Sequence, residues 1–193
     1  MSSVVISGDT SGAITIAAPA VAGTYTQTLP MITGTLGTLN SGTAVASTSG
    51  TSIDFTSIPA NVRRITVMFN GVSLNGSSSF LVQIGNGTPT TTGYSSITSY
   101  VTSAATCLAT TSTNGFIVQA GAASHVAFGS LTLSNVSGNT WVASGVLGNI
   151  VSSPFTINTA GVIALGSALN MVRITTVNGT DTFDAGSINI LYE

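Results

Sequence analysis

Apolar residues alternate with polar or small residues along most of this chain, and this period of two limits its fold more than any other feature. In RRITVMFNG (residues 63–71), Ile65, Val67 and Phe69 fall on one side of an extended strand. The same pattern recurs at residues 79–87, 124–136, 170–179 and 187–192. No window combines apolar residues at helical spacing with good helix formers. Alternating runs of β-branched and aromatic residues predict strands.

Turn signals separate these runs. The dipeptide Asn-Gly, which tolerates the positive φ angles of tight hairpins, occurs at Asn70, Asn75, Asn86, Asn114 and Asn178. Many short strands at regular intervals are typical of antiparallel two-sheet folds. The sequence therefore predicts an all-β fold, with a jelly-roll-like antiparallel β-sandwich, called the knob below, over residues 41–193.

Residues 1–40 differ from the knob. They contain short apolar triplets and two prolines, Pro19 and Pro30, and are too apolar for a disordered linker and too few to bury a core. We expect an extended N-terminal arm whose strands pair with another chain.

Charged residues make up 4% of the chain, against about 25% in an ordinary globular protein. Three arginines and no lysine exclude a nucleic-acid surface, which needs a basic patch. No stretch approaches the roughly 18 to 20 apolar residues of a membrane helix, so no membrane insertion is expected. The mean hydropathy is nevertheless +0.53, which predicts that the chain buries surface against copies of itself.

The single cysteine and the N-terminus bear on the compartment. Cys107 has no partner for an internal disulfide and no basic neighbour, which predicts a buried small hydrophobe in a reducing cytosol. The first ten residues lack the pattern of a secretory signal. One Cys and one His cannot supply a closed zinc site, and no metal or cofactor is expected.

Catalytic groups are few. His125 is the only histidine, and no strained GxSxG turn accompanies it, so we expect a strand residue at a surface or subunit contact. Among the acids, Asp54 precedes a proline turn and Glu193 ends the chain, which leaves Asp181 and Asp184 as a possible pair. The sequence predicts a protein that is not an enzyme.

Asp181 and Asp184 follow an Asn-Gly turn and admit three interpretations. They cap backbone N–H groups at the turn, they pair with cations, or they begin a calcium site that would need further oxygens. The cations available are Arg63, Arg64 and Arg173. Turn capping or charge pairing is favoured over a metal.

Residues 88–115 are the segment richest in Thr and Ser, and they carry Tyr94 and Tyr100. One interpretation is a strand with long surface loops. The other is a contact surface, since loops on a rigid sheet often carry binding function. Tyr94 and Tyr100 are then the candidate contacts to a glycan.

Three segments resemble a known family: IDFTSIPANVRRITVMFNGVSLNGSSSFLVQIG (53–85), GNTWVASGVLG (138–148) and VRITTVNGTDTFDAGSINILYE (172–193). They are similar to the C-terminal domain of tail-fibre and other surface-appendage proteins of tailed bacteriophages. The N-terminal VVISGDTSGAITIAAPAVAGTYTQTLP resembles segments that precede such domains in phage fibres. The resemblance implies a homotrimeric virion structural protein with a β-rich knob, and it implies no catalytic residue.

About forty residues precede the knob in this sequence, so we do not expect the long fibre shaft of the family here. We therefore expect a capsid decoration (cement) protein on the virion surface, made in the host cytoplasm and held by its N-terminal arm. Its partners would be its own copies and the major capsid protein or tail proteins. The alternative is a short tail fibre or fibre tip that binds a host surface polysaccharide.

Overall fold

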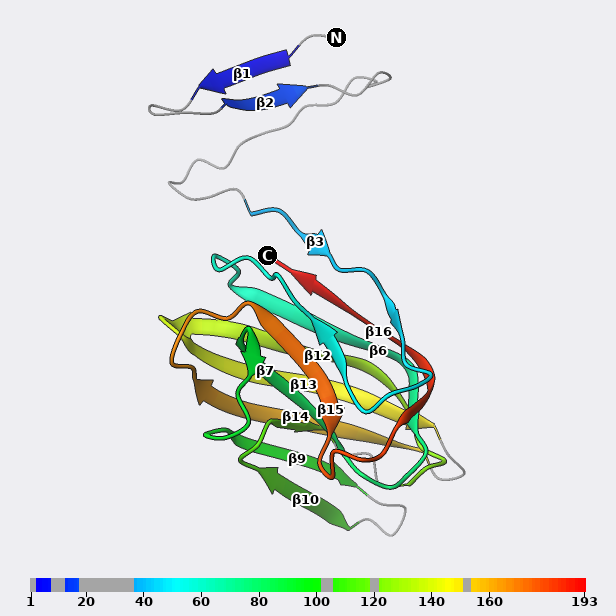
Figure 1. Ribbon diagram of the computed structural model, residues 1–193. Helices are drawn as coiled ribbons and strands as arrows, with labels where there is room; N and C mark the ends of the chain where they lie inside the picture. Colours follow the sequence, from blue (N-terminus) through cyan, green and yellow to red (C-terminus); the bar gives the residue numbers. More distant parts are fainter. Residues whose placement is uncertain (1–2, 8–12, 18–36, 102–105, 119–121, 151–153) are drawn as a thin grey trace. The chain divides into compact units, whose positions relative to one another are not determined.

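The computed structural model describes residues 3–7, 13–17, 37–101, 106–118, 122–150 and 154–193 (Figure 1). Contacts divide the chain into two units, residues 1–36 and 37–193. In the first unit, strands β1 (Ser3–Ser7) and β2 (Ala13–Ala17) form an antiparallel pair. The pairing of an arm with another chain stays a prediction.

The larger sheet of the second unit has nine strands among the described residues. In spatial order they are β10 (Cys107–Ser112), β9 (Ser95–Val101), β14 (Phe155–Ala164), β13 (Thr140–Ile150), β12 (Val126–Ser137), β6 (Arg64–Leu74) and β16 (Phe183–Tyr192), with the short β3 (Asn40–Ser41) and β4 (Val45–Ala46) beside β16. Every neighbouring pair is antiparallel. Strands β12, β13 and β14 follow one another as a meander (Figure 1).

The smaller sheet has five antiparallel strands among the described residues. Their order is β11 (Phe116–Val118), β7 (Phe80–Asn86), β15 (Met171–Thr176) and β5 (Ile53–Phe55), and β8 (Thr88–Pro89) also pairs with β7. Strands of this sheet lie in front of the larger sheet in Figure 1.

Both sheets contribute to one hydrophobic core, as in a sandwich. Val67 of β6 and Val82 of β7 are fully buried in it. The ring of Phe80 lies 5.9 Å from that of Phe69 and 6.2 Å from that of Phe183, so aromatic contacts join the two sheets. The predicted all-β, antiparallel fold in two sheets is confirmed, because the alternating apolar residues of the strands face this core.

One Asn-Gly dipeptide lies inside a strand instead of in a turn. Asn70 and Gly71 belong to β6, where three residue steps on β6 span two on each neighbouring strand. This is a β-bulge, and the φ angle of 66° at Gly71 is one that glycine adopts readily. The bulge lets Phe69 and Val72, three residues apart, both be buried in the core.

Two sequence expectations need correction. Residues 88–115 contain three strands, of which β9 and β10 pair as a hairpin, instead of one strand with long loops. Cys107, expected to be buried, is exposed at the start of β10. It is exposed because β10 is the last strand of its sheet, and residues 107–111 are all exposed.

Candidate functional site

Arg173 and Asp54 form an ion pair across two strands of the smaller sheet. They are register partners on β15 and β5, and the guanidinium donates from Nε to Oδ1 and from Nη2 to Oδ2, both at 2.6 Å. These hydrogen bonds raise the pKa of Arg173. The pair joins the short strand β5 to β15, so Arg173 binds neither Asp181 nor Asp184.

Arg63 and Arg64 lie where the chain ends. Both backbone N–H groups donate to the Glu193 carbonyl oxygen, at 2.7 and 3.0 Å. The Arg64 side chain forms an ion pair with Glu193 at 2.5 Å, and Arg63 Nη1 donates to Asn135 Oδ1 at 2.7 Å. These contacts fasten the last strand to β6 and β6 to β12.

Asp181 bridges two loops. Its carboxylate accepts hydrogen bonds from Asn178 Nδ2 at 2.7 Å and from the Ser78 backbone N–H at 2.9 Å. The hydrogen bond from Asn178, followed by that from Ser78, lowers the pKa of Asp181. A Cβ placed on Gly76 would lie 2.2 Å from Oδ2, so the neighbouring loop approaches the carboxylate too closely for a larger residue.

The Asn75-Gly76 and Asn178-Gly179 turns are joined by further bonds. Asn75 donates its backbone N–H to Thr182 O at 3.0 Å, and its Oδ1 accepts from the Thr182 N–H at 2.8 Å. Asp184 accepts from the Ser73 hydroxyl group. The two acids therefore hold loops and strand ends together, and no three His, Cys, Asp or Glu side chains of the described residues gather as a metal site.

Tyr94 is a core residue. Its side chain is 2% exposed. Its hydroxyl oxygen accepts a hydrogen bond from the Ile84 N–H at 2.8 Å, and its O–H donates to the Ile84 carbonyl oxygen at 3.2 Å. Its ring meets Phe116 edge-on at 5.0 Å. Burial raises the pKa of Tyr94 to about 12. Tyr94 thus lacks the exposed ring that a glycan contact needs.

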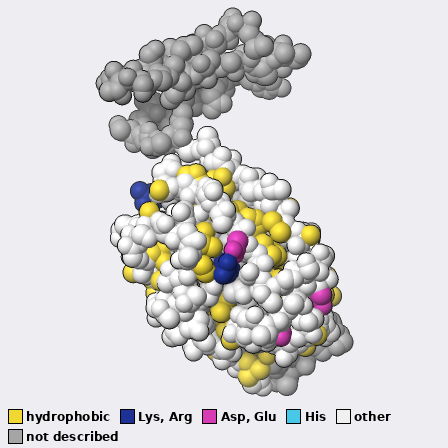
Figure 2. All heavy atoms as spheres, viewed as in Figure 1, with side chains coloured by type: hydrophobic (Ala, Val, Ile, Leu, Met, Phe, Trp, Pro, Cys, Tyr) yellow, Lys and Arg dark blue, Asp and Glu magenta, His cyan; other side chains and the backbone are white. Residues whose placement is uncertain are grey.

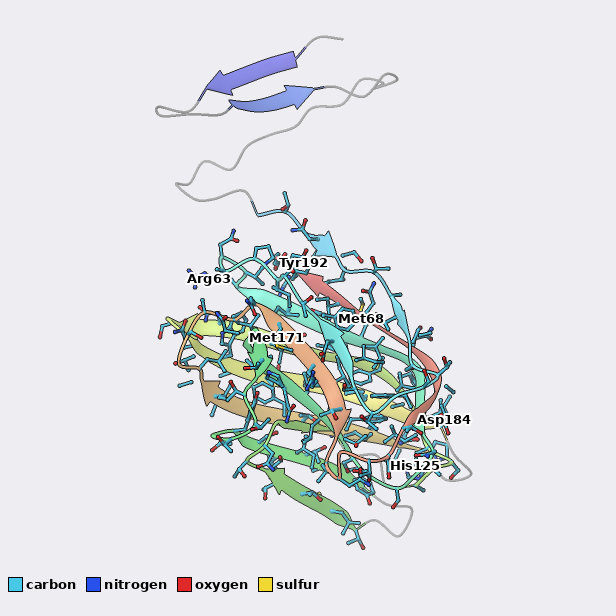
Figure 3. All side chains as sticks on the ribbon, viewed as in Figure 1. Arg63, Met68, His125, Met171, Asp184 and Tyr192 are labelled. Carbon is cyan, nitrogen blue, oxygen red and sulfur yellow. The ribbon has the colours of Figure 1, made fainter. Side chains whose placement is uncertain are left out.

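Tyr100 belongs to an aromatic cluster near the opposite end of β9. Its partly buried ring lies 4.7 Å from that of Phe155, and the His125 ring meets Phe155 edge-on at 5.3 Å. His125 precedes β12 instead of lying within it. In Figure 3, His125 and Asp184 lie toward one end of the sandwich, and Arg63 and Tyr192 lie toward the other. We call Tyr100, Phe155 and His125 the aromatic end cluster.

Asn149 lies beside this cluster and was not identified from the sequence. It is a register partner of Phe155, it is 1% exposed, and its Oδ1 accepts from the Val126 N–H at 3.0 Å. Its Nδ2 has no hydrogen-bond partner among the described residues. The alternation along β13 could have identified it. Asn149 lies on the same side of this strand as the buried Ala143 and Leu147, so the pattern places a polar side chain on the inward side.

Exposed apolar side chains gather on the outward surface of the larger sheet, with Ser, Thr and Asn residues between them. Four adjacent strands carry eight exposed large apolar side chains, one of which, Val136 (61%), lies at the register shift near the end of β12. The other seven are Ile97 (46%), Val101 (56%), Phe128 (42%), Val142 (37%), Val146 (58%), Ile150 (60%) and Val162 (40%). We call these seven residues the outer apolar face. Val101, Phe128, Val146 and Ile150 line a groove of about 680 Å³ on it.

Comparison with protein-family models, curated proteins and solved structures finds no match to this chain. In the part of the chain that the structure describes, there is no helix with the length and hydropathy to cross a membrane.

Proposed function

We propose that this chain is a non-enzymatic structural protein on the outer surface of a tailed bacteriophage virion. In this proposal it is a homotrimeric capsid decoration knob attached through residues 1–40, with the major capsid protein as its partner. The sequence resemblance to phage surface-appendage proteins supports the class of protein. We also propose that the two antiparallel sheets around the core have a jelly-roll-like arrangement.

The contacts that the charged side chains make within the chain are the observation that supports a structural role. The described residues include every charged residue of the chain except Asp9. Each of these seven side chains makes a hydrogen bond or an ion pair within the chain, and the bonds join strands, loops or the C-terminus. Figure 2 accordingly shows few charged side chains among apolar and uncharged ones. These contacts support the proposal that the charged side chains have a structural role.

Imaging of intact particles tests the placement. Particles carrying an epitope-tagged copy of this protein would be labelled with antibody and examined by electron microscopy. We expect label on the capsid shell. Label confined to the tail would overturn the capsid placement, and particles without label would overturn the virion role.

A substitution tests the absence of catalysis. The Asp181→Ala, Asp184→Ala double variant would be compared with the wild type in an assay of host-glycan hydrolysis. We expect no measurable hydrolysis from either protein. Hydrolysis by the wild type that the double variant loses would show that these acids serve a reaction.

The aromatic end cluster favours a second candidate function, a short tail fibre or fibre tip that binds a host surface polysaccharide. Partly buried aromatic rings beside an imidazole group offer both apolar and hydrogen-bonding contacts to a ligand. If this function holds, soluble protein adsorbs to host cells and blocks infection, and Tyr100→Ala weakens both effects. Soluble protein that does neither would exclude it.

A further inference from the structure

The two outward surfaces of the sandwich differ in charge. The smaller sheet carries the Arg173–Asp54 ion pair, with each side chain about one-third exposed. The strands of the outer apolar face, β9, β12, β13 and β14, contain no charged residue, and β10 beside them has none. Among the described residues, the part of the larger sheet formed by β9, β12, β13 and β14 therefore presents an extended outward surface without charge, whereas β6 and β16 of the same sheet carry Arg64 and Asp184.

The absence of charge limits what can cover this face. A partner rich in charged groups would lose hydration there and would find no opposite charge in return. A second copy of this chain offers the matching chemistry, because its own outer face is apolar and uncharged over the same strands. Exposed apolar side chains gathered on one surface are typical of interaction sites.

The size of the face is sufficient for a stable contact. Four strands spaced about 4.8 Å apart and roughly ten residues long at about 3.3 Å per residue cover on the order of 600 Å². Three such faces packed around a common axis bury about 1,800 Å² in total, which for the whole assembly lies within the range for specific interfaces. Because side chains project from the sheet, the area that they bury exceeds this estimate for a plane.

The side chains of the face lose little freedom when they are covered. Apart from Phe128, its exposed members are Val and Ile, whose χ1 angles are restricted by branching. The Phe128 ring already lies across Gly148, where an added Cβ would be 2.3 Å from Cζ. The ring thus forms one wall of the groove. Association therefore orders few flexible groups, which lowers its entropic cost.

We infer that the outer apolar face is the surface through which copies of this chain associate, with the same face of neighbouring copies packed around a three-fold axis. This inference rests on the self-association within the proposed function and adds which surface makes it. The covered side chains then form a second apolar core between the copies.

A charge placed on the face tests the inference. Val146→Asp puts a carboxylate where the side chain is 58% exposed in the single chain, and Val177→Asp is the matched control at 54% exposed outside the face. Both proteins and the wild type would be examined by sedimentation velocity at micromolar concentration, with circular dichroism to verify folding. We expect wild type and Val177→Asp to be trimers. Val146→Asp should associate at least roughly 100-fold more weakly, because its carboxylate would leave water without a cation.

A second measurement does not depend on the charged variant being folded. In a Cys107→Ser background, Val146→Cys and Val177→Cys would be reacted with a bulky maleimide. We expect the thiol at position 146 to react at least about tenfold more slowly at trimer-forming concentration, and as fast as the thiol at 177 after dilution to monomer.

The outcomes separate the inference from the proposed function. A monomeric wild type would overturn self-association itself, and the inference with it. A trimeric wild type whose assembly is unaffected by Val146→Asp and whose position 146 reacts freely would overturn only the placement of the interface.

Discussion

Removal of one oxygen atom from Tyr94 tests the structural role that the fold assigns to this residue. Tyr94→Phe keeps the buried ring and its edge-on contact with Phe116 but leaves the Ile84 N–H without its acceptor at a site that is 0% exposed. An unsatisfied buried donor costs about 1–3 kcal/mol. We therefore expect the free energy of unfolding to fall by about 2 kcal/mol.

Urea and thermal denaturation would measure the loss. With an m-value of about 2 kcal/mol/M, the midpoint shifts by about 1 M urea. For a chain of this size, Tm falls by roughly 4–8 °C. Tyr192→Phe is the control, since the Tyr192 hydroxyl makes no hydrogen bond to any described residue, and its effect should stay within about 0.5 kcal/mol. A Tyr94→Phe protein as stable as the wild type would refute the hydroxyl's bonding role.

The raised pKa gives the same experiment a pH dependence. Tyr94 titrates at about 12 in the folded chain and at about 10 when unfolded. Its contribution is therefore fully present below pH 10 and is lost as the pH rises through 12, by up to about 2–3 kcal/mol. The stability difference between wild type and Tyr94→Phe should narrow over that range. A difference that is constant from pH 9 to 12 would contradict the burial of this phenol.

Three further predictions concern the contacts that hold the loops and strands. Asp54→Asn should lower the free energy of unfolding by under about 1 kcal/mol, because the Arg173–Asp54 pair is about one-third exposed. The loss should be smaller in 1 M NaCl than in 50 mM NaCl, as measured by urea denaturation at both salt concentrations. A loss that does not depend on salt would contradict an ionic origin. Because the pKa of Asp181 is lowered, its stabilisation is present above the ordinary carboxyl pKa and is lost as the pH falls through the folded-state value. Thermal scans from pH 5 to 2 should accordingly show a smaller decline for Asp181→Asn than for the wild type, and equal declines would count against the loop bridge. Gly76→Ala should destabilise by about 1–3 kcal/mol, because its methyl group overlaps the Asp181 carboxylate, whereas Gly166→Ala, with no atom within 4 Å, should be near neutral by the same denaturation assay.

The sequence predicted which residues of a strand face the core but not which strands are neighbours. The alternation in 63–71 predicted that Ile65, Val67 and Phe69 share a side, and all three are buried. The hairpin of β9 and β10 was missed, because Ser and Thr fill the positions where apolar residues would mark the period. Cys107 was placed inside because a free cysteine is usually buried, and only the position of β10 at the sheet edge made it exposed.

The candidate site was less predictable than the fold. Asp181 could be assigned to a turn because it follows Asn178 by only three residues in the sequence. Its bond to Ser78 and the Arg173–Asp54 pair join residues about a hundred positions apart, so no local pattern contains them. Tyr94 was chosen for a surface from its polar neighbours in sequence, although tertiary packing buries it.

By itself the sequence determined the class of structure, because alternation and turn residues act through local backbone geometry, and it determined that the surface would be nearly uncharged. The tertiary structure decided where each remaining charge is used and where the exposed apolar residues gather. Pairing between distant strands sets both, since the energy of a β-sheet depends on which strands become neighbours and which of their faces meet. The outer apolar face exists only because β9, β12, β13 and β14 pair in one register, which places scattered valines and isoleucines on one surface.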